Sequence, residues 1–167
     1  MLTEAKSCTI NLAIRMSGRT WPVIHNLQQS KPTLQSIFRE QRCPQEIMVR
    51  VQSSINCGDH RPEPDLVWSR RMPAKRLRPT HADVLLLIEV SDSSTEQDLG
   101  EKARLYAEHG IPEYWVVDVQ AEQVHVHRTP SQGIYQSIQS FNKPTLISPH
   151  CQPAARLSLA ELFDLDS

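Results

Sequence analysis

The sequence predicts an α/β domain in which a central mixed β-sheet is flanked by helices. Residues 84–90 form an apolar run that is too short for a typical helix and is typical of a strand buried on both faces. Strand-like and helix-like segments also follow one another in a mixed order along the chain. With 167 residues, the chain is long enough for one domain with an adequate core.

The first half of the chain contains a poorly patterned beginning and then recognisable elements. Residues 1–30 show no strong periodicity, so we expect a divergent N-terminal segment there and a single domain over residues 31–167. Apolar residues spaced as on one face of a helix predict a short helix over residues 34–42. Residues 47–51 and 66–68 read as strands, and residues 56–64 between them are rich in turn-forming glycine, asparagine and proline.

The second half begins with the clearest strand, over residues 84–90, after a polar connection over residues 69–83. Ser93 with Glu96, or Ser94 with Gln97, has the spacing of a capping box, which predicts a helix that starts there and runs to about His109. Residues 114–119 form another buried-looking strand. Residues 124–127 predict a half-exposed strand that pairs with residues 135–138 in a hairpin. Ser158 and Glu161 predict the cap of a last short helix.

Composition excludes some classes of protein and leaves others open. The formal net charge of −1 argues against a protein that coats nucleic acid, but allows an enzyme with a local basic patch. No stretch is long and apolar enough to cross a membrane, and the N-terminus lacks the layout of a secretory signal, so we expect a cytoplasmic protein. The four cysteines have no metal or redox spacing and are expected to be free thiols: Cys8, Cys43, Cys57 and Cys151.

Two acids and a lysine are the candidate catalytic residues. Asp65 begins one predicted strand, and Glu89 lies near the end of another. A lone carboxylate in a buried strand is costly unless a cation compensates its charge. Two carboxylates from neighbouring strands could hold Mg²⁺ and leave positions open for a phosphate. Lys102, on the predicted helix, could then orient water or offset charge in the transition state.

Each of these residues also has a structural interpretation. Asp65 could cap a turn after Pro64, and Glu89 could be an acid at a strand end that reaches solvent. Lys102 follows Asp98 by four residues, in the order that favours an ion pair along a helix. The triplet is more informative than its members, because the strand, turn and helix would bring Glu89 and Lys102 to one end of the sheet.

A basic stretch lies between the two acid-bearing strands. Such a loop could contact DNA phosphates in a way that does not depend on sequence, or it could be a solvated loop without a partner. Its members are Arg70, Arg71, Lys75, Arg76 and Arg78. His125 and His127 share a strand face and could chelate a metal ion, although exposed strand histidines rarely do.

The combined motifs resemble those of the Uma-type restriction endonuclease family, within the PD-(D/E)XK nuclease-like superfamily. The resemblance covers roughly residues 45–165 and is carried by Pro64-Asp65, Glu89-Val90-Ser91, Asp98 with Lys102, and the segment YAEHGIPEYWVVD at 106–118. It implies a restriction-endonuclease-like core over residues 31–167 and a magnesium-dependent nuclease site. Asp65 matches the first metal-binding acid and Glu89 the second. The superfamily's usual lysine position is Ser91 here, and Lys102 matches a lysine that has moved to the next helix.

We therefore expect a magnesium-dependent endonuclease that hydrolyses DNA, with Mn²⁺ as a possible substitute. Asp98 would support Lys102, and a homodimer would allow both strands of a duplex to be cut. The family usually opens with a hairpin that carries an acidic segment, which residues 1–30 do not match. This mismatch and Ser91 favour the alternative, a catalytically inactive nuclease-fold protein that binds nucleic acid or another partner. A hydrolase of another phosphodiester is a third interpretation.

Overall fold

The computed structural model describes residues 15–16, 19–20, 46–73 and 78–164. The chain divides into two compact units, Met1–Lys31 and Pro32–Ser167. The first contains a short antiparallel pair, β1 (Arg15–Met16) and β2 (Arg19–Thr20). The helix expected over residues 34–42 lies outside the described residues. All further elements belong to the second unit.

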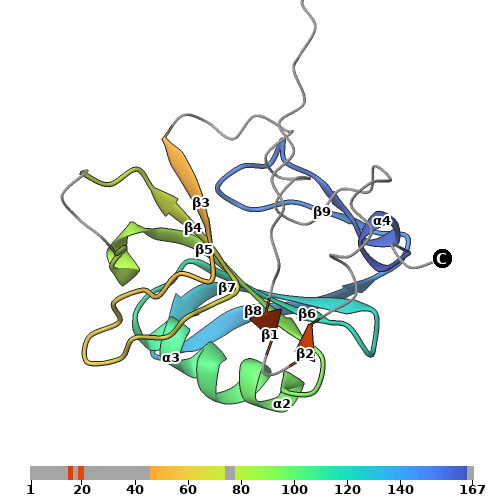
Figure 1. Ribbon diagram of the computed structural model, residues 1–167, viewed down its shortest axis with the longest axis horizontal. Coiled ribbons are helices and arrows are strands. Elements are labelled where there is room, and N and C mark those ends of the chain that lie inside the picture. Colours follow the sequence, from red (N-terminus) through yellow and green to blue (C-terminus); the bar gives the residue numbers. More distant parts are fainter. Residues whose placement is uncertain (1–14, 17–18, 21–45, 74–77, 165–167) are drawn as a thin grey trace, which may run out of the picture. The chain divides into compact units, whose positions relative to one another are not determined.

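A six-stranded mixed sheet forms the centre of the second unit, as the sequence predicts (Figure 1). Its strands lie in chain order: β3 (Ile47–Val51), β4 (Leu66–Arg70), β5 (Val84–Ser91), β6 (Glu113–Asp118), β7 (Gln123–Ser131) and β8 (Ile134–Asn142). Only β5 and β6 pair in parallel, and every other neighbouring pair is antiparallel. Parallel strands need a crossover connection, which here carries Asp98 and Lys102 of the candidate site.

The crossover from β5 to β6 is a helical segment interrupted by a wider turn. It consists of α2 (Thr95–Gln97), a π-helical turn (Asp98–Lys102) and α3 (Ala103–Glu108). Gly110 follows with a φ of +67°, a left-handed conformation that suits glycine and ends the helix. The predicted helix is therefore confirmed in position, but its central turn is not α-helical.

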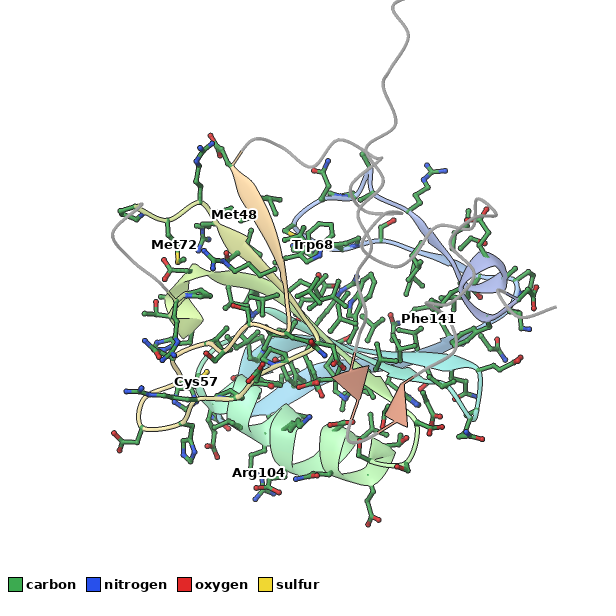
Figure 2. All side chains as sticks on the ribbon, viewed as in Figure 1. Met48, Cys57, Trp68, Met72, Arg104 and Phe141 are labelled. Carbon is green, nitrogen blue, oxygen red and sulfur yellow. The ribbon has the colours of Figure 1, made fainter. Side chains whose placement is uncertain are left out.

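Two cores cover the two faces of the sheet. On the face that carries α3, Tyr106 and Tyr114 pack with Val67 and Leu87. On the opposite face, Trp68 packs with apolar side chains of β5, β6 and β7. Figure 2 shows Trp68 on the side of the sheet away from α3, whereas the labelled Arg104 projects from α3 away from the sheet. Alternate residues of β4 and β5 therefore serve different cores, which explains their nearly continuous burial.

Additional short elements complete the unit. A 3₁₀ turn (His81–Asp83) precedes β5. Two strands that the sequence did not predict, β9 (Leu146–Ile147) and β10 (Leu157–Ser158), pair antiparallel. The predicted last helix is α4 (Leu159–Phe163), and the Ser158 hydroxyl accepts a hydrogen bond from the Glu161 amide at 3.3 Å, as expected for a cap.

The structure also bears on the expected hairpin, on the cysteines and on membrane-spanning helices. The hairpin of β7 and β8 is confirmed, but His127 is buried and not half-exposed, because it packs against the rings of Tyr114 and Tyr135. Cys57 is a buried free thiol, Cys151 is half-buried, and the other two cysteines lie outside the described residues. No helix within the described ranges has the length and apolar character needed to span a bilayer.

Candidate active site

The pairing of β4 with β5 brings the two candidate acids together. Leu66 is paired with Ile88, so continuing this antiparallel register by one residue places Asp65 opposite Glu89. Side chains of directly opposed residues project from the same face of a sheet. That face is the one covered by α3, because Val67 and Leu87 each lie two residues from an acid, on the same face, and pack in the α3 core.

Glu89 is buried, with an exposed fraction of 4%. Its Oε1 atom accepts a hydrogen bond from the Tyr106 hydroxyl at 3.0 Å and lies 3.2 Å from the Lys102 amine. Burial raises the pKa of the Glu89 carboxyl to about 7, although Lys102 acts in the opposite direction. The interpretation of Glu89 as a solvent-reaching acid at a strand end is therefore wrong.

Lys102 lies between two acids. Its Nζ atom is 2.7 Å from Oδ1 of Asp98 and 3.2 Å from Oε1 of Glu89. Burial alone would lower the pKa of Lys102, but the two carboxylates outweigh it, so the pKa is raised. The structural interpretation of Lys102 is confirmed, because it pairs with Asp98 along the helix, and the same amine also reaches Glu89.

A chain of hydrogen-bonded hydroxyl groups leads to the carboxylate of Asp98. The Ser94 hydroxyl donates to Oδ2 of Asp98 at 2.9 Å and lies 3.2 Å from the Ser91 hydroxyl. Thr95 donates to Ser91 at 3.1 Å. Ser94 is the N-cap of α2 but makes no side-chain capping bond, so the capping box expected with Gln97 is absent. Ser91, where the superfamily pattern has its lysine, thus helps to hold the acid that pairs with Lys102.

Asp65 contacts the strand that carries Glu89. Its Oδ2 atom accepts a hydrogen bond from the Val90 amide at 2.8 Å, so it does not act as a turn cap. Burial raises the pKa of Asp65, whereas the Val90 amide and Lys102 lower it. The structure therefore brings Asp65, Glu89, Lys102 and Asp98 to one end of the sheet.

The donor set fits a hard divalent cation. Within the described residues, Oδ1 of Asp65 and Oε2 of Glu89 accept no hydrogen bond, and no group of three or more His, Cys, Asp or Glu side chains could hold a metal ion. The site therefore offers two carboxylates and no closed cage. Mg²⁺ is commonly bound in this way, by one or two carboxylates with water and substrate phosphate as the other ligands.

The described arginines of the predicted basic loop lie at the other end of β4. Asp65 immediately precedes β4 and Arg70 ends it, so the two are roughly 17 Å apart at about 3.4 Å per residue. Arg71 and Arg78 are exposed beyond the Arg70 end of the strand. Lys75 and Arg76 lie outside the described residues. One guanidinium nitrogen of Arg70 donates to the Ala82 carbonyl at 2.9 Å, which ties Arg70 to the start of β5.

Two buried tyrosines, which the sequence did not single out, also belong to the site. Tyr106 and Tyr114 are fully buried, but their hydroxyl groups bond to Glu89 and to the backbone of Asp98. The available signal was their register: Tyr106 lies one helical turn beyond Lys102, on the same helix face. His125 and His127, by contrast, lie on β7, two strands across the sheet from β5, and His125 bonds to Ser140 at 2.8 Å.

The mixed sheet and its helical crossover match a nuclease-like fold. A crystal structure described as that of a putative nuclease belonging to DUF820 from Anabaena variabilis ATCC 29413 superposes with a TM-score of 0.61. It is 22% identical, and the match covers 78% of this chain and 75% of that one. No curated protein matches the chain.

The sequence model of the Uma2 family, described as "Putative restriction endonuclease", matches residues 19–160. The chain belongs to this family. The match confirms the resemblance and begins further toward the N-terminus than residue 45, where we expected it to begin. Membership supports a hydrolytic enzyme of the nuclease type.

Proposed function

We propose that this protein is a magnesium-dependent endonuclease that hydrolyses phosphodiester bonds of DNA, with Mn²⁺ able to replace Mg²⁺. The observation that carries the proposal is the convergence of Lys102 on Glu89 and Asp98, at 3.2 and 2.7 Å, beside the carboxylate of Asp65. Family membership supports the nuclease class.

Each side chain has a distinct role in this proposal. Asp65 and Glu89 hold the divalent ion, which when bound polarises the scissile phosphate and makes water a better nucleophile. Because its pKa is raised, Lys102 is charged at neutral pH. Lys102 therefore acts as a hydrogen-bond donor that orients the attacking water and stabilises charge on the phosphate, and not as a base. Asp98 holds the Lys102 amine in reach of Glu89.

The substrate contacts extend beyond the acids. The basic loop with Arg70, Arg71, Lys75, Arg76 and Arg78 would bind phosphates of the same duplex. Because Arg70 and Asp65 lie at opposite ends of β4, such a duplex would span roughly 17 Å between the two places, or about five base pairs at 3.4 Å each. A homodimer would present two such sites to the two strands.

Plasmid cleavage tests the proposal. We expect the wild-type protein to nick or linearise plasmid DNA with Mg²⁺ or Mn²⁺ and to be inactive with chelator. Lys102→Ala and Glu89→Ala should each lower kcat by roughly 10²- to 10³-fold. Glu101→Ala is the matched control, because Glu101 is an exposed acid next to Lys102 in the same turn. Absence of cleavage by the wild type with either metal would overturn the proposal.

Metal binding separates the active enzyme from an inactive member of the same fold. We expect calorimetric titration with Mn²⁺ to show binding to the wild type and none to Asp65→Ala, because Asp65 supplies one of the two carboxylates proposed to hold the ion. A protein that binds DNA but no divalent ion would instead be the catalytically inactive nucleic-acid-binding module.

DNA affinity tests the basic loop. Replacing Arg70, Arg71 and Arg76 by alanine should weaken binding to any duplex sequence and reduce the dependence of the binding constant on salt. The control is Arg104→Ala, because Arg104 is exposed on α3 and projects away from the sheet (Figure 2). Equal affinity of the triple variant and the wild type would remove the loop from the interface.

A further inference from the structure

We propose that Tyr106 and Tyr114 are positioning residues of this site: Tyr106 orients the carboxylate of Glu89, and Tyr114 fixes the π-helical turn that carries Lys102. For its effect on cleavage, the inference rests on the proposed function. The contacts themselves are independent of it. Neither tyrosine would touch substrate, so each acts through the residue it holds.

Tyr106 acts on one oxygen of Glu89. Its hydroxyl donates to Oε1 at 3.0 Å, and the Lys102 amine is 3.2 Å from the same atom. Two donors on one oxygen fix the rotation of the carboxylate and leave Oε2 as the oxygen available to a cation. Burial and the charge of Glu89 raise the pKa of Tyr106, so its hydroxyl stays protonated and remains a donor.

Tyr114 acts on the helix backbone. Its hydroxyl donates to the carbonyl oxygen of Asp98 at 3.1 Å, at the first residue of the π-helical turn Asp98–Lys102. A π turn is rarer than an α turn, and its persistence needs support from its surroundings. The donor from β6 gives that support at the residue whose side chain holds Lys102 at 2.7 Å. Tyr114 thereby links the sheet to the position of the lysine.

The rings of Tyr106 and Tyr114 pack against each other. Their ring centroids are 4.9 Å apart at an interplanar angle of 66°, an edge-to-face contact. Tyr114 also stacks on Tyr135, with centroids 6.4 Å apart. The Tyr135 hydroxyl donates to the Ile111 carbonyl at 2.9 Å, which is the same kind of buried bond but does not touch the site. Tyr135→Phe is therefore a matched control for both residues.

The first measurement separates positioning from a structural role. Each of Tyr106→Phe, Tyr114→Phe and Tyr135→Phe removes one buried hydroxyl, so all three should shift the urea midpoint by similar amounts. We expect Tyr106→Phe and Tyr114→Phe to lower kcat for DNA cleavage by roughly 10- to 100-fold with little change in KM. Tyr135→Phe should retain the wild-type kcat. Equal kcat values in all three variants would overturn the inference.

The second measurement does not depend on cleavage. In Tyr114→Phe, the Lys102 amine should be acetylated by acetic anhydride faster than in the wild type or Tyr135→Phe, as followed by peptide mass spectrometry. In Tyr106→Phe, the Kd for Mn²⁺ should rise roughly 10- to 100-fold, because an unsupported ligand binds metal less well.

These readouts distinguish the two proposals. A wild type that neither cleaves DNA nor binds Mn²⁺, together with faster labelling of Lys102 in Tyr114→Phe, would overturn the proposed function and support the role of Tyr114. Unchanged labelling in Tyr114→Phe would overturn that role even if the wild type cleaves DNA. An unchanged Kd in Tyr106→Phe, with a wild type that binds Mn²⁺, would overturn the role of Tyr106.

Discussion

Glu89 and Glu113 are both buried carboxylates on neighbouring strands, yet their surroundings differ. Their exposed fractions are 4% and 1%. Glu89 lies near the end of β5 on the face of α3, whereas Glu113 begins β6 and contacts Trp115, which belongs to the opposite core. The two positions show how one fold uses the same side chain in two ways.

The difference lies in how many hydrogen bonds each carboxylate accepts. Oε1 of Glu113 accepts from Arg128 Nε at 2.7 Å and from the Trp115 indole at 2.9 Å, and Oε2 accepts from the His150 amide at 2.6 Å. Both oxygens are engaged, and the charge is paired with a guanidinium. Glu89 has donors from the described residues on one oxygen only. A fully satisfied buried acid stabilises the fold, whereas a partly satisfied one retains capacity for a ligand.

The largest stability effect is expected at Glu113. Glu113→Ala should lower the free energy of unfolding by about 3–5 kcal/mol, because a partly buried Arg128 charge, the buried Trp115 indole and the His150 amide lose this acceptor. Urea denaturation at pH 7.5 measures the change. A loss no greater than that of Glu89→Ala would break the comparison.

Replacing Glu89 is expected to change the free energy of unfolding in the opposite direction at high pH. Its carboxyl pKa is raised from 4.5 to about 7, so between these values the folded protein binds more protons than the unfolded chain, and stability falls as pH rises. Above pH 7 the cost reaches about 3 kcal/mol. Glu89→Gln should therefore be more stable than the wild type at pH 8 and similar to it at pH 4. Urea midpoints at both values measure this, and a less stable variant at pH 8 would contradict it.

Magnesium should increase the difference in stability between the wild type and a variant at Glu89. If Glu89 reserves an oxygen for a cation, Mg²⁺ at 100 times its Kd should raise the free energy of unfolding of the wild type by about 2.7 kcal/mol. Glu89→Gln should gain much less. Thermal melts with and without Mg²⁺ at pH 8 measure the shift, and equal gains in both proteins would place the ion elsewhere.

The smallest effect is expected at Ser91. Ser91→Ala removes the hydroxyl that contacts Ser94 and Thr95, at a cost of about 1 kcal/mol. Its urea midpoint should therefore lie between those of the wild type and Glu113→Ala. A loss of stability as large as that of Glu113→Ala would show that the hydroxyl groups bonded to Asp98 stabilise the fold as much as the hydrogen bonds of Glu113 do.

The acidic site could be predicted because its members follow strong local patterns. Glu89 interrupts an apolar strand, and the helix that carries Lys102 returns to the same sheet end. The separation of Arg70 from the acids could also have been predicted, because Asp65 and Arg70 occupy opposite ends of one strand. Their closeness in sequence drew attention away from this separation. The network of Glu113 could not be predicted, since Arg128 and His150 approach it through pairing and loop geometry. The π turn also has no sequence signal and depends on Tyr114.

The single parallel pair, β5 with β6, has a consequence for assembly of the site. Glu89 lies on β5 and the crossover carries Asp98, Lys102 and Tyr106, so these groups meet after closing only a short loop. Contacts between residues close in sequence form early in folding. We therefore expect these groups to come together as one local folding unit. Asp65 joins them only when β4 and β5 have paired along their whole length, because it lies at the end of this pair that is far from the connecting loop.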